Sequence, residues 1–141
     1  LDCAGHREAS LMDVAVRIEG VDELVQRFGN LRMQTILRPP MNRGLLEIQA
    51  ALQEYPEARP TSSYVRTGRL GKAWTNRVYT EPGAIYGVVG NNVEYAPFVQ
   101  NYQFQSRVHK RRWLTDKAAV EQFRSGIVAD FQRTIQRALE E

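Results

Sequence analysis

The sequence predicts an α+β domain in which a small antiparallel β-sheet, made of an N-terminal strand and a hairpin or meander, packs against helices. Three observations support this class. Residues 14–18 (VAVRI) alternate apolar and polar side chains, as a half-buried strand does. Two strand-like runs, residues 74–80 and 84–90, flank a turn signal. A long C-terminal stretch repeats apolar residues at helical spacing.

The chain has 141 residues, a length that favours one domain with a modest core. Residues 1–11 (LDCAGHREASL) show neither helical nor strand periodicity. We expect them to be a disordered or non-native extension, with Met12 as the natural start. Residues 12–141 are then a single α+β domain.

Two helices are predicted in the first half of the chain. Within residues 21–31 apolar side chains recur at helical spacing, which predicts a short amphipathic helix. The Gly-Asn pair at residues 29–30 predicts its end. Pro39 and Pro40 predict the start of a second helix, because proline is tolerated at the first helical position. That helix should end before Pro56, since the residue before a proline resists helical geometry.

The middle of the chain alternates loop and strand signals. Prolines and small polar residues dominate residues 55–64, which predicts a surface loop. Residues 66–74 fit either a short helix or the entry to a strand. The Glu-Pro-Gly turn at residues 81–83 joins the two strands of a predicted antiparallel hairpin. Gly87 interrupts the second strand, which indicates a bulge or a close approach of another segment to the backbone.

A long helix is predicted at the C-terminal end. Thr115 or Asp116 is its expected N-cap, and the helix runs to about Arg137. Its apolar residues fall on one face, which should pack on the core. They are Val120, Phe123, Ile127, Phe131, Ile135 and Ala138.

The composition is that of an ordinary globular domain, with 43% hydrophobic and 25% charged residues. The formal net charge of +3 permits contact with DNA or an acidic partner and requires neither. Cys3 is the only cysteine, so neither an intramolecular disulfide nor a thiolate metal site is expected, and a cytosolic history fits best. No apolar run approaches the roughly 20 residues that a membrane span needs, so we expect no membrane partner.

No group of residues predicts catalysis. His6 and His109 are far apart in the sequence, and neither has the spacing of metal ligands. Ser62 and Ser63 lack the context of a nucleophile elbow. The glycine pairs in GRLG and GVVG match no phosphate-binding loop. We therefore expect a protein that is not an enzyme and that uses no cofactor and no metal ion.

The strongest chemical signal is a basic cluster at residues 107–112. It contains Arg107, Lys110, Arg111 and Arg112 beside His109, with Tyr102, Phe104 and Trp113 close by in the sequence. Basic and aromatic side chains together can hold a phosphate backbone and stack on unpaired bases. A small nucleic-acid-binding module that uses this loop is therefore an alternative function, while a solvated loop before a helix is the simpler interpretation.

Three motifs in a fixed order carry a family resemblance: TGRLGKAW at residues 67–74, VEYAPFVQ at residues 93–100, and RRWLTDKAA at residues 111–119. From about residue 14 onward the chain resembles the small tail-completion, or head–tail joining, proteins of lambdoid long-tailed phages and prophages. The matching positions are Thr67, Gly68, Leu70, Tyr95, Ala96, Val99, Trp113, Leu114 and Ala118. Gln100 stands where the family has glutamate, and Asn101-Tyr102 replaces its glycine step.

The resemblance implies a virion structural protein that acts through protein–protein contacts. Such a subunit is expected to form a closed ring, possibly a hexamer, and to contact other phage neck or tail proteins. It would lie in the virion of an active phage and otherwise in the bacterial cytoplasm. A ring needs two different contact patches on each copy.

Candidate interface residues come mainly from residues 91–105, where aromatic side chains are frequent. For Tyr95, Ala96 and Phe98 the alternative to an interface is burial against the last helix, whereas Tyr102 and Phe104, which have glutamine and asparagine neighbours, are expected to be partly exposed contact surface. The loop at residues 55–64 or the hairpin tip is the candidate second patch. The interface candidates are Tyr95, Phe98, Tyr102, Phe104 and Tyr64.

Overall fold

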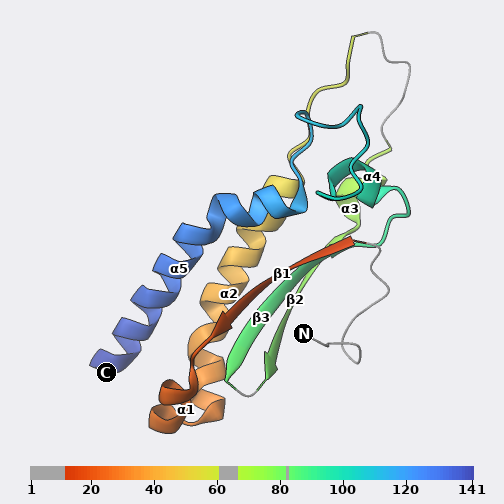
Figure 1. Cartoon of the computed structure of the whole chain (residues 1–141). Helices are drawn as coiled ribbons and strands as arrows, with labels where there is room; N and C mark the ends of the chain where they lie inside the picture. Colours follow the sequence, from red (N-terminus) through yellow and green to blue (C-terminus); the bar gives the residue numbers. More distant parts are fainter. Residues whose placement is uncertain (1–11, 61–66, 82) are drawn as a thin grey trace.

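The computed structural model describes residues 12–60, 67–81 and 83–141, and it confirms the α+β class (Figure 1). A three-stranded antiparallel sheet packs against helices, one of which is the long C-terminal helix. In chain order the elements are β1 (Met12–Glu19), α1 (Asp22–Phe28), α2 (Asn30–Leu52), α3 (Arg69–Lys72), β2 (Trp74–Glu81), β3 (Ala84–Asn91), α4 (Ala96–Gln100) and α5 (Asp116–Glu140).

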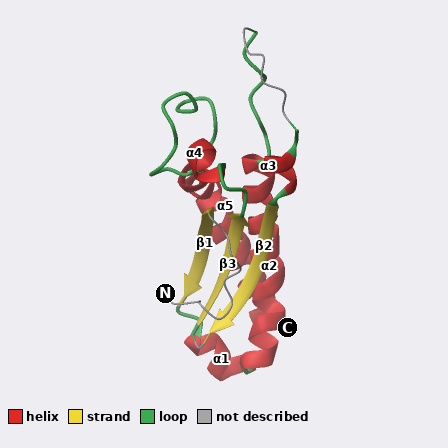
Figure 2. Ribbon diagram, turned by 90° about the vertical axis from the view of Figure 1, so that its right-hand side faces the viewer, coloured by secondary structure: helices red, strands yellow, loops and turns green. Residues whose placement is uncertain are grey.

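The strand order is β1-β3-β2, with both outer strands antiparallel to β3 (Figure 2). Strands β2 and β3 form the predicted hairpin, and β1 adds to its other edge. Val14 and Asn76 both pair with Val89, so the three strands share one register. Because side chains alternate along a strand, residue 89 and every second residue on either side of it face the helices.

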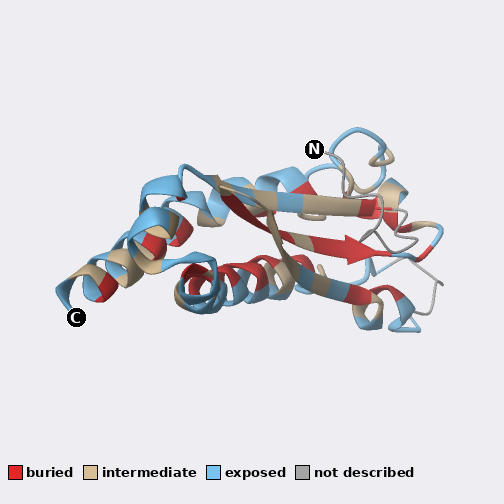
Figure 3. Ribbon diagram, turned by 90° about the horizontal axis from the view of Figure 1, so that it is seen from below, coloured by how far each residue is buried: buried red, intermediate tan, exposed pale blue. Residues whose placement is uncertain are grey.

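Helix α2 lies along one face of the sheet, and α5 packs beside α2 and reaches β1 (Figure 1). Buried residues gather where the strands face α2 (Figure 3). The core includes Met33, Leu37, Met41, Leu45, Ile48 and Leu52 from α2, Ile85 and Val89 from β3, and Ile127 and Phe131 from α5.

Two glycines allow α2 to approach its neighbours closely. A Cβ atom on Gly87 of β3 would lie 2.5 Å from Leu45 Cδ1, which is well inside van der Waals contact. A Cβ on Gly44 of α2 would lie 3.0 Å from Ile127 Cγ1 of α5. The interruption of the strand pattern at Gly87 therefore marks a close approach, and the strand pairing continues through it without a bulge.

The prediction that Pro39 and Pro40 open the second helix was wrong. Helix α2 begins at Asn30, and both prolines lie inside it. Each proline removes one backbone hydrogen bond. Burial of Met33 and Leu37 in the turns before the prolines offsets this loss, because tertiary packing provides most of the stability of a helix in a protein.

The first helix ends where the Gly-Asn pair predicts, at Phe28, and Gly29 follows with a φ of 84°. Leu31, however, belongs to α2 and is 80% exposed, so its predicted place on the apolar face of the first helix was wrong. A left-handed φ favours glycine, which has no Cβ to clash with the backbone. Gly29 thus makes the corner between two helices, and the helical spacing of the sequence does not continue across it.

Helix α5 is capped as predicted, because the Thr115 hydroxyl accepts a hydrogen bond of 3.2 Å from the Ala118 amide. Arg43 of α2 binds the Asp130 carboxylate of α5 with two hydrogen bonds of 2.8 and 2.9 Å. The guanidinium lowers the pKa of Asp130. None of the described helices is long and apolar enough to cross a membrane.

Candidate interaction surface

Residues 101–114 form a loop between α4 and α5, beside α3 and beyond the end of the sheet (Figure 1). Its backbone is folded into successive turns. The Ser106 amide donates to the Phe98 carbonyl at 2.7 Å, and the Gln105 amide donates to the Asn101 carbonyl at 2.9 Å. The Trp113 amide donates to the His109 carbonyl at 3.0 Å. The loop therefore has a defined shape without regular secondary structure.

Asn101 and Asp116 tie the start of the loop to the first turn of α5. Asn101 Nδ2 donates to Asp116 Oδ2 at 3.0 Å, and Asp116 Oδ1 accepts from the Tyr102 amide at 3.2 Å. On its other side, Asn101 Oδ1 accepts from the amides of Gln103 and Phe104. Asp116 is 2% exposed, and this burial raises the pKa of its carboxyl group, although its hydrogen bonds oppose the shift.

Two glutamines hold the loop from inside. The fully buried Gln100 donates through Nε2 to the carbonyls of Leu52 and Leu114, at 3.0 and 3.1 Å. Gln105 Nε2 donates to the carbonyls of Val99 and Trp113, at 2.8 and 3.0 Å. A glutamate at position 100 would offer no such donor when ionised. We call Gln100, Asn101, Gln105 and Asp116 the polar scaffold.

Large apolar side chains project from the outside of this loop. Seven large hydrophobic side chains are exposed in the described part of the chain, and four of them lie within residues 98–108. We call these four the apolar tip: Phe98 (56% exposed), Tyr102 (52%), Phe104 (61%) and Val108 (58%). Scattered apolar residues are normal on a protein surface, whereas a concentration of them indicates a contact site.

The predicted interface residues fall into three groups. Ala96 is buried and Tyr95 is partly buried against the core, as expected for the start of the aromatic run. Phe98, Tyr102 and Phe104 are each more than half exposed, so the alternative of burial for Phe98 was wrong. Tyr64 lies outside the described residues. Whether these side chains contact a partner stays a prediction.

The residues of the basic cluster do not all face the same way in the folded loop. Arg107, Lys110 and Arg111 are exposed, and within residues 12–60, 67–81 and 83–141 no ion pair engages them. Arg112 instead turns toward the segment after α2, where its Nη2 donates to the Glu57 carbonyl at 2.7 Å. The structure therefore presents three of the four predicted basic residues to solvent.

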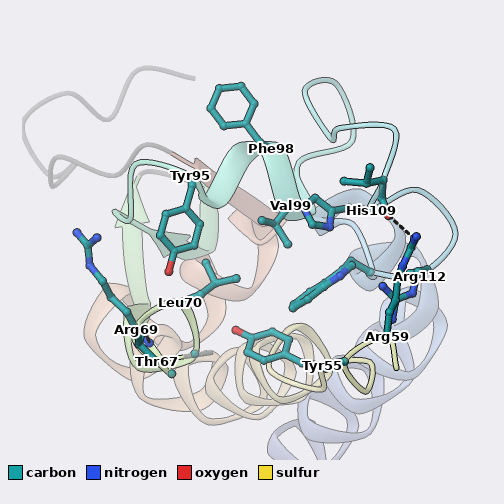
Figure 4. A pocket seen from close by; sticks show the side chains of 15 residues that line it. Tyr55, Arg59, Thr67, Arg69, Leu70, Tyr95, Phe98, Val99, His109 and Arg112 are labelled. Atoms are coloured by element: carbon teal, nitrogen blue, oxygen red, sulfur yellow. Dashed lines mark hydrogen bonds between the residues drawn. The ribbon is translucent and has the colours of Figure 1, made fainter. Parts of the chain in front are cut away.

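A pocket of about 510 Å³ lies under the loop (Figure 4). Its apolar walls include Tyr55, Leu70, Val99 and Trp113, and the Tyr55 and Trp113 rings are 4.8 Å apart. The sequence did not predict this pocket. Its lining comes from the segment after α2, from α3, from α4 and from the loop, and no single stretch of sequence carries the signal.

Positive charge surrounds this pocket. Arg59 Nη2 donates to the Val108 carbonyl at 3.0 Å on one side, and Arg69 pairs with Glu94 on another, at 2.8 and 2.9 Å. Burial, together with the charges of Arg112 and Arg59, lowers the pKa of His109. The positive potential and the partial desolvation therefore both favour the neutral imidazole.

Among the described residues no group of three or more histidine, cysteine, aspartate or glutamate side chains could hold a metal ion. Comparison of the chain with protein-family models, curated proteins and solved structures found no match. What the site can do must therefore be argued from its own geometry.

Sequence reasoning missed the polar scaffold as well. The signal was present in NYQFQ, residues 101–105, where polar and aromatic residues alternate. In that stretch Asn101 and Gln105 turn inward to backbone groups, whereas Tyr102 and Phe104 turn outward. The alternation resembles a strand pattern, yet here the polar side chains are the inner ones.

Proposed function

We propose that this chain is a structural subunit that binds other proteins through the apolar tip and assembles into a closed ring at the head–tail junction or tail terminus of a long-tailed phage or prophage. The observation that carries the proposal is the exposure of Phe98 on α4 and of Tyr102, Phe104 and Val108 on the loop that follows, which buried polar groups hold in shape. The ordered motifs at residues 67–74, 93–100 and 111–119 support the choice of phage family.

The physical basis is the cost of ordering a contact surface. Aromatic side chains provide large apolar area, and they are enriched at the centres of protein interfaces. A loop that is already folded loses little conformational entropy when a partner covers it. The polar scaffold therefore favours binding although none of its own side chains needs to touch the partner.

A ring also requires a second patch, because each copy must present two different surfaces to its neighbours. The hairpin tip is one candidate. The described part of the loop after α2 is the other, and it contacts residues 107–112 through Arg59 and Arg112.

Sedimentation velocity at increasing protein concentration, followed by negative-stain imaging, tests the proposal. We expect wild-type protein to form annular oligomers and the Tyr102→Ser/Phe104→Ser variant to remain monomeric. The matched control is Leu31→Ser/Leu46→Ser, which removes two other apolar side chains of similar or greater exposure and should assemble like wild type. A wild-type chain that is monomeric at every concentration contradicts the proposal, as does normal assembly of the Tyr102→Ser/Phe104→Ser variant.

Contact with nucleic acid is a second candidate function, favoured by the exposure of Arg107, Lys110 and Arg111 on the same loop. If all three bind phosphates of a single strand, the logarithm of affinity should fall against the logarithm of salt concentration with a slope of about −2. Fluorescence anisotropy with a labelled oligonucleotide measures this slope. The Arg107→Gln/Arg111→Gln variant should reduce it to about −0.7, whereas Arg38→Gln/Arg133→Gln, two exposed arginines elsewhere, should not change it.

A further inference from the structure

We propose that the pocket under the loop receives an extended segment of a neighbouring protein, with an aromatic side chain in the pocket and an adjacent carboxylate at Arg59 and Arg112 (Figure 4). This inference rests on the proposed function, since the segment belongs to an assembly partner. It goes beyond that function by naming a second site and the chemistry that fills it.

The pocket is large enough for an aromatic side chain together with atoms of its neighbouring residues, and its lining suits an apolar group. Its volume of about 510 Å³ falls in the range of about 300–1,000 Å³ that is usual for binding pockets. Tyr55 is fixed in place, because its hydroxyl accepts a hydrogen bond of 3.0 Å from Trp74 Nε1. Trp113 packs against Tyr55 and, in an edge-on contact with centroids 5.8 Å apart, against His109. The apolar walls are therefore rigid before any partner arrives.

The charge around the pocket selects an anionic partner. Three arginines and one histidine line it, and no aspartate or glutamate is among its described lining residues. Arg69 already binds Glu94 through two hydrogen bonds. Arg59 and Arg112 each donate one hydrogen bond to a backbone carbonyl, which leaves their positive charges without a carboxylate partner in the described ion pairs. A carboxylate that reaches them would form a charge-assisted hydrogen bond.

The position of the pocket favours a protein segment over a free small molecule. Phe98 and Val108 line the pocket and also belong to the apolar tip. A partner that covers the tip therefore lies directly at the pocket opening. Because Arg59 and Arg112 themselves line the pocket, and an extended chain advances only about 3.3 Å per residue, a carboxylate on a residue next to the aromatic anchor lies near them.

Three blocked peptides test separately whether binding needs the aromatic side chain and whether it needs the carboxylates. Each peptide is titrated into ¹⁵N-labelled monomeric protein. The first is acetyl-Asp-Phe-Glu-amide, the second replaces its acids to give acetyl-Asn-Phe-Gln-amide, and the third replaces its ring to give acetyl-Asp-Ala-Glu-amide. We expect the first to shift the indole N–H signal of Trp113 and the amides of Val99 and His109. The second and third should bind about tenfold more weakly, because each lacks one of the two interactions.

Variants of the protein locate the binding. Arg59→Gln should weaken the first peptide about tenfold and leave the second unchanged. Ala58→Phe places a ring in the pocket and should abolish binding of the first peptide while both arginines remain. The matched control is Arg38→Gln, an exposed arginine about 21 Å along α2 from the end of that helix at Leu52, next to the pocket, which should bind like wild type.

The outcomes distinguish this inference from the proposed function. Three results would overturn the inference: equal binding of the charged and neutral peptides, signal shifts away from the pocket, or no binding at about 5 mM peptide. That concentration is on the order of the millimolar affinity expected of so small a ligand. Any of these results combined with normal ring assembly of wild-type protein overturns the pocket alone. Their combination with a strictly monomeric wild type overturns both.

Discussion

The two ends of the molecule differ in which side chains are buried and which face solvent. Where α2 and α5 cover the sheet, apolar residues such as Leu45 and Ile127 are buried, and charged residues such as Arg43 face solvent. At the loop end, the buried polar side chains of Gln100 and Asp116 lie among the interior residues, and the aromatic residues Tyr102 and Phe104 face solvent.

The difference shows how each end is stabilised and which apolar side chains remain exposed for contact with a partner. The covered sheet gains stability by removing apolar area from water, so its apolar residues are already used in folding. The loop end is also held by the hydrogen bonds that Gln100, Asn101, Gln105 and Asp116 make, so the residues of the apolar tip remain available. Removing part of the helix-covered core should therefore reduce stability, and removing part of the apolar tip should reduce assembly.

The largest loss of stability is expected for Ile48→Ala. Ile48 is 0% exposed in the centre of the helix–sheet core, and truncation leaves a cavity. The free energy of unfolding should fall by about 3–4 kcal/mol, measured by urea denaturation. The control Leu46→Ala, on the exposed side of the same helix, should change it by less than about 0.5 kcal/mol. Similar losses in the two variants would contradict the assignment of the core.

A smaller loss, about 2 kcal/mol, is expected for Asp116→Asn. An asparagine at this position must turn its NH2 group either toward the Asn101 amide or toward the backbone amides of Tyr102 and Lys117, and in both orientations a donor faces a donor. Urea denaturation measures the loss, and hydrogen exchange should show it concentrated in residues 101–114. Glu121→Gln, an exposed acid on the same helix, is the control. An unchanged stability would mean that the polar scaffold does not hold the loop.

The ion pair between the two long helices should contribute least to stability. Arg43→Gln is expected to cost about 0.5 kcal/mol at pH 7, because the Arg43 side chain is 52% exposed. Since Arg43 lowers the pKa of Asp130, the contribution is present above the unfolded value near 3.8 and is lost as pH falls through the folded pKa. Urea denaturation of both proteins should therefore show a difference at pH 7 that disappears near pH 2. A difference that persists in acid would contradict a charge-based contribution.

Truncation of the apolar tip should leave stability almost unchanged. Phe104→Ser removes a side chain that is 61% exposed, so the free energy of unfolding of dilute protein, measured by urea denaturation, should stay within about 0.5 kcal/mol of wild type. The same variant should raise the concentration needed for assembly at least about tenfold, which corresponds to the loss of one aromatic anchor at an interface. A strongly destabilised Phe104→Ser variant would show that this ring belongs to the fold.

Most of the fold could be predicted from local pattern. The hairpin, the N-terminal strand and the cap at Thr115 depend on short-range signals, and each is present in the structure. The start of α2 could not be predicted from Pro39 and Pro40, because the burial of Met33 and Leu37 depends on the sheet and on α5. The sequence identified Gly87 as an unusual position in the strand, but it could not distinguish a bulge from a close approach. That distinction depends on Leu45 of α2, which packs against Gly87 in the fold.

The candidate site was only partly predictable. The aromatic run identified Tyr102 and Phe104, since polar neighbours on both sides argue against burial. The role of Gln100 was hidden, because its partners are the carbonyls of Leu52 and Leu114, 48 and 14 positions away. The pocket was hidden for the same reason, since Tyr55, Leu70, Val99 and Trp113 meet only after folding.

Amide hydrogen exchange of residues 101–108, measured in dilute and in concentrated protein, shows whether the loop is folded in the monomer and whether a partner covers it. The amides of Tyr102, Gln103 and Phe104 donate to the polar scaffold, so they should be protected in the monomer and exchange at least about tenfold more slowly again after assembly. Exchange at the rate of an unfolded peptide in dilute protein, or protection that does not change on assembly, would contradict a preformed loop that a partner covers.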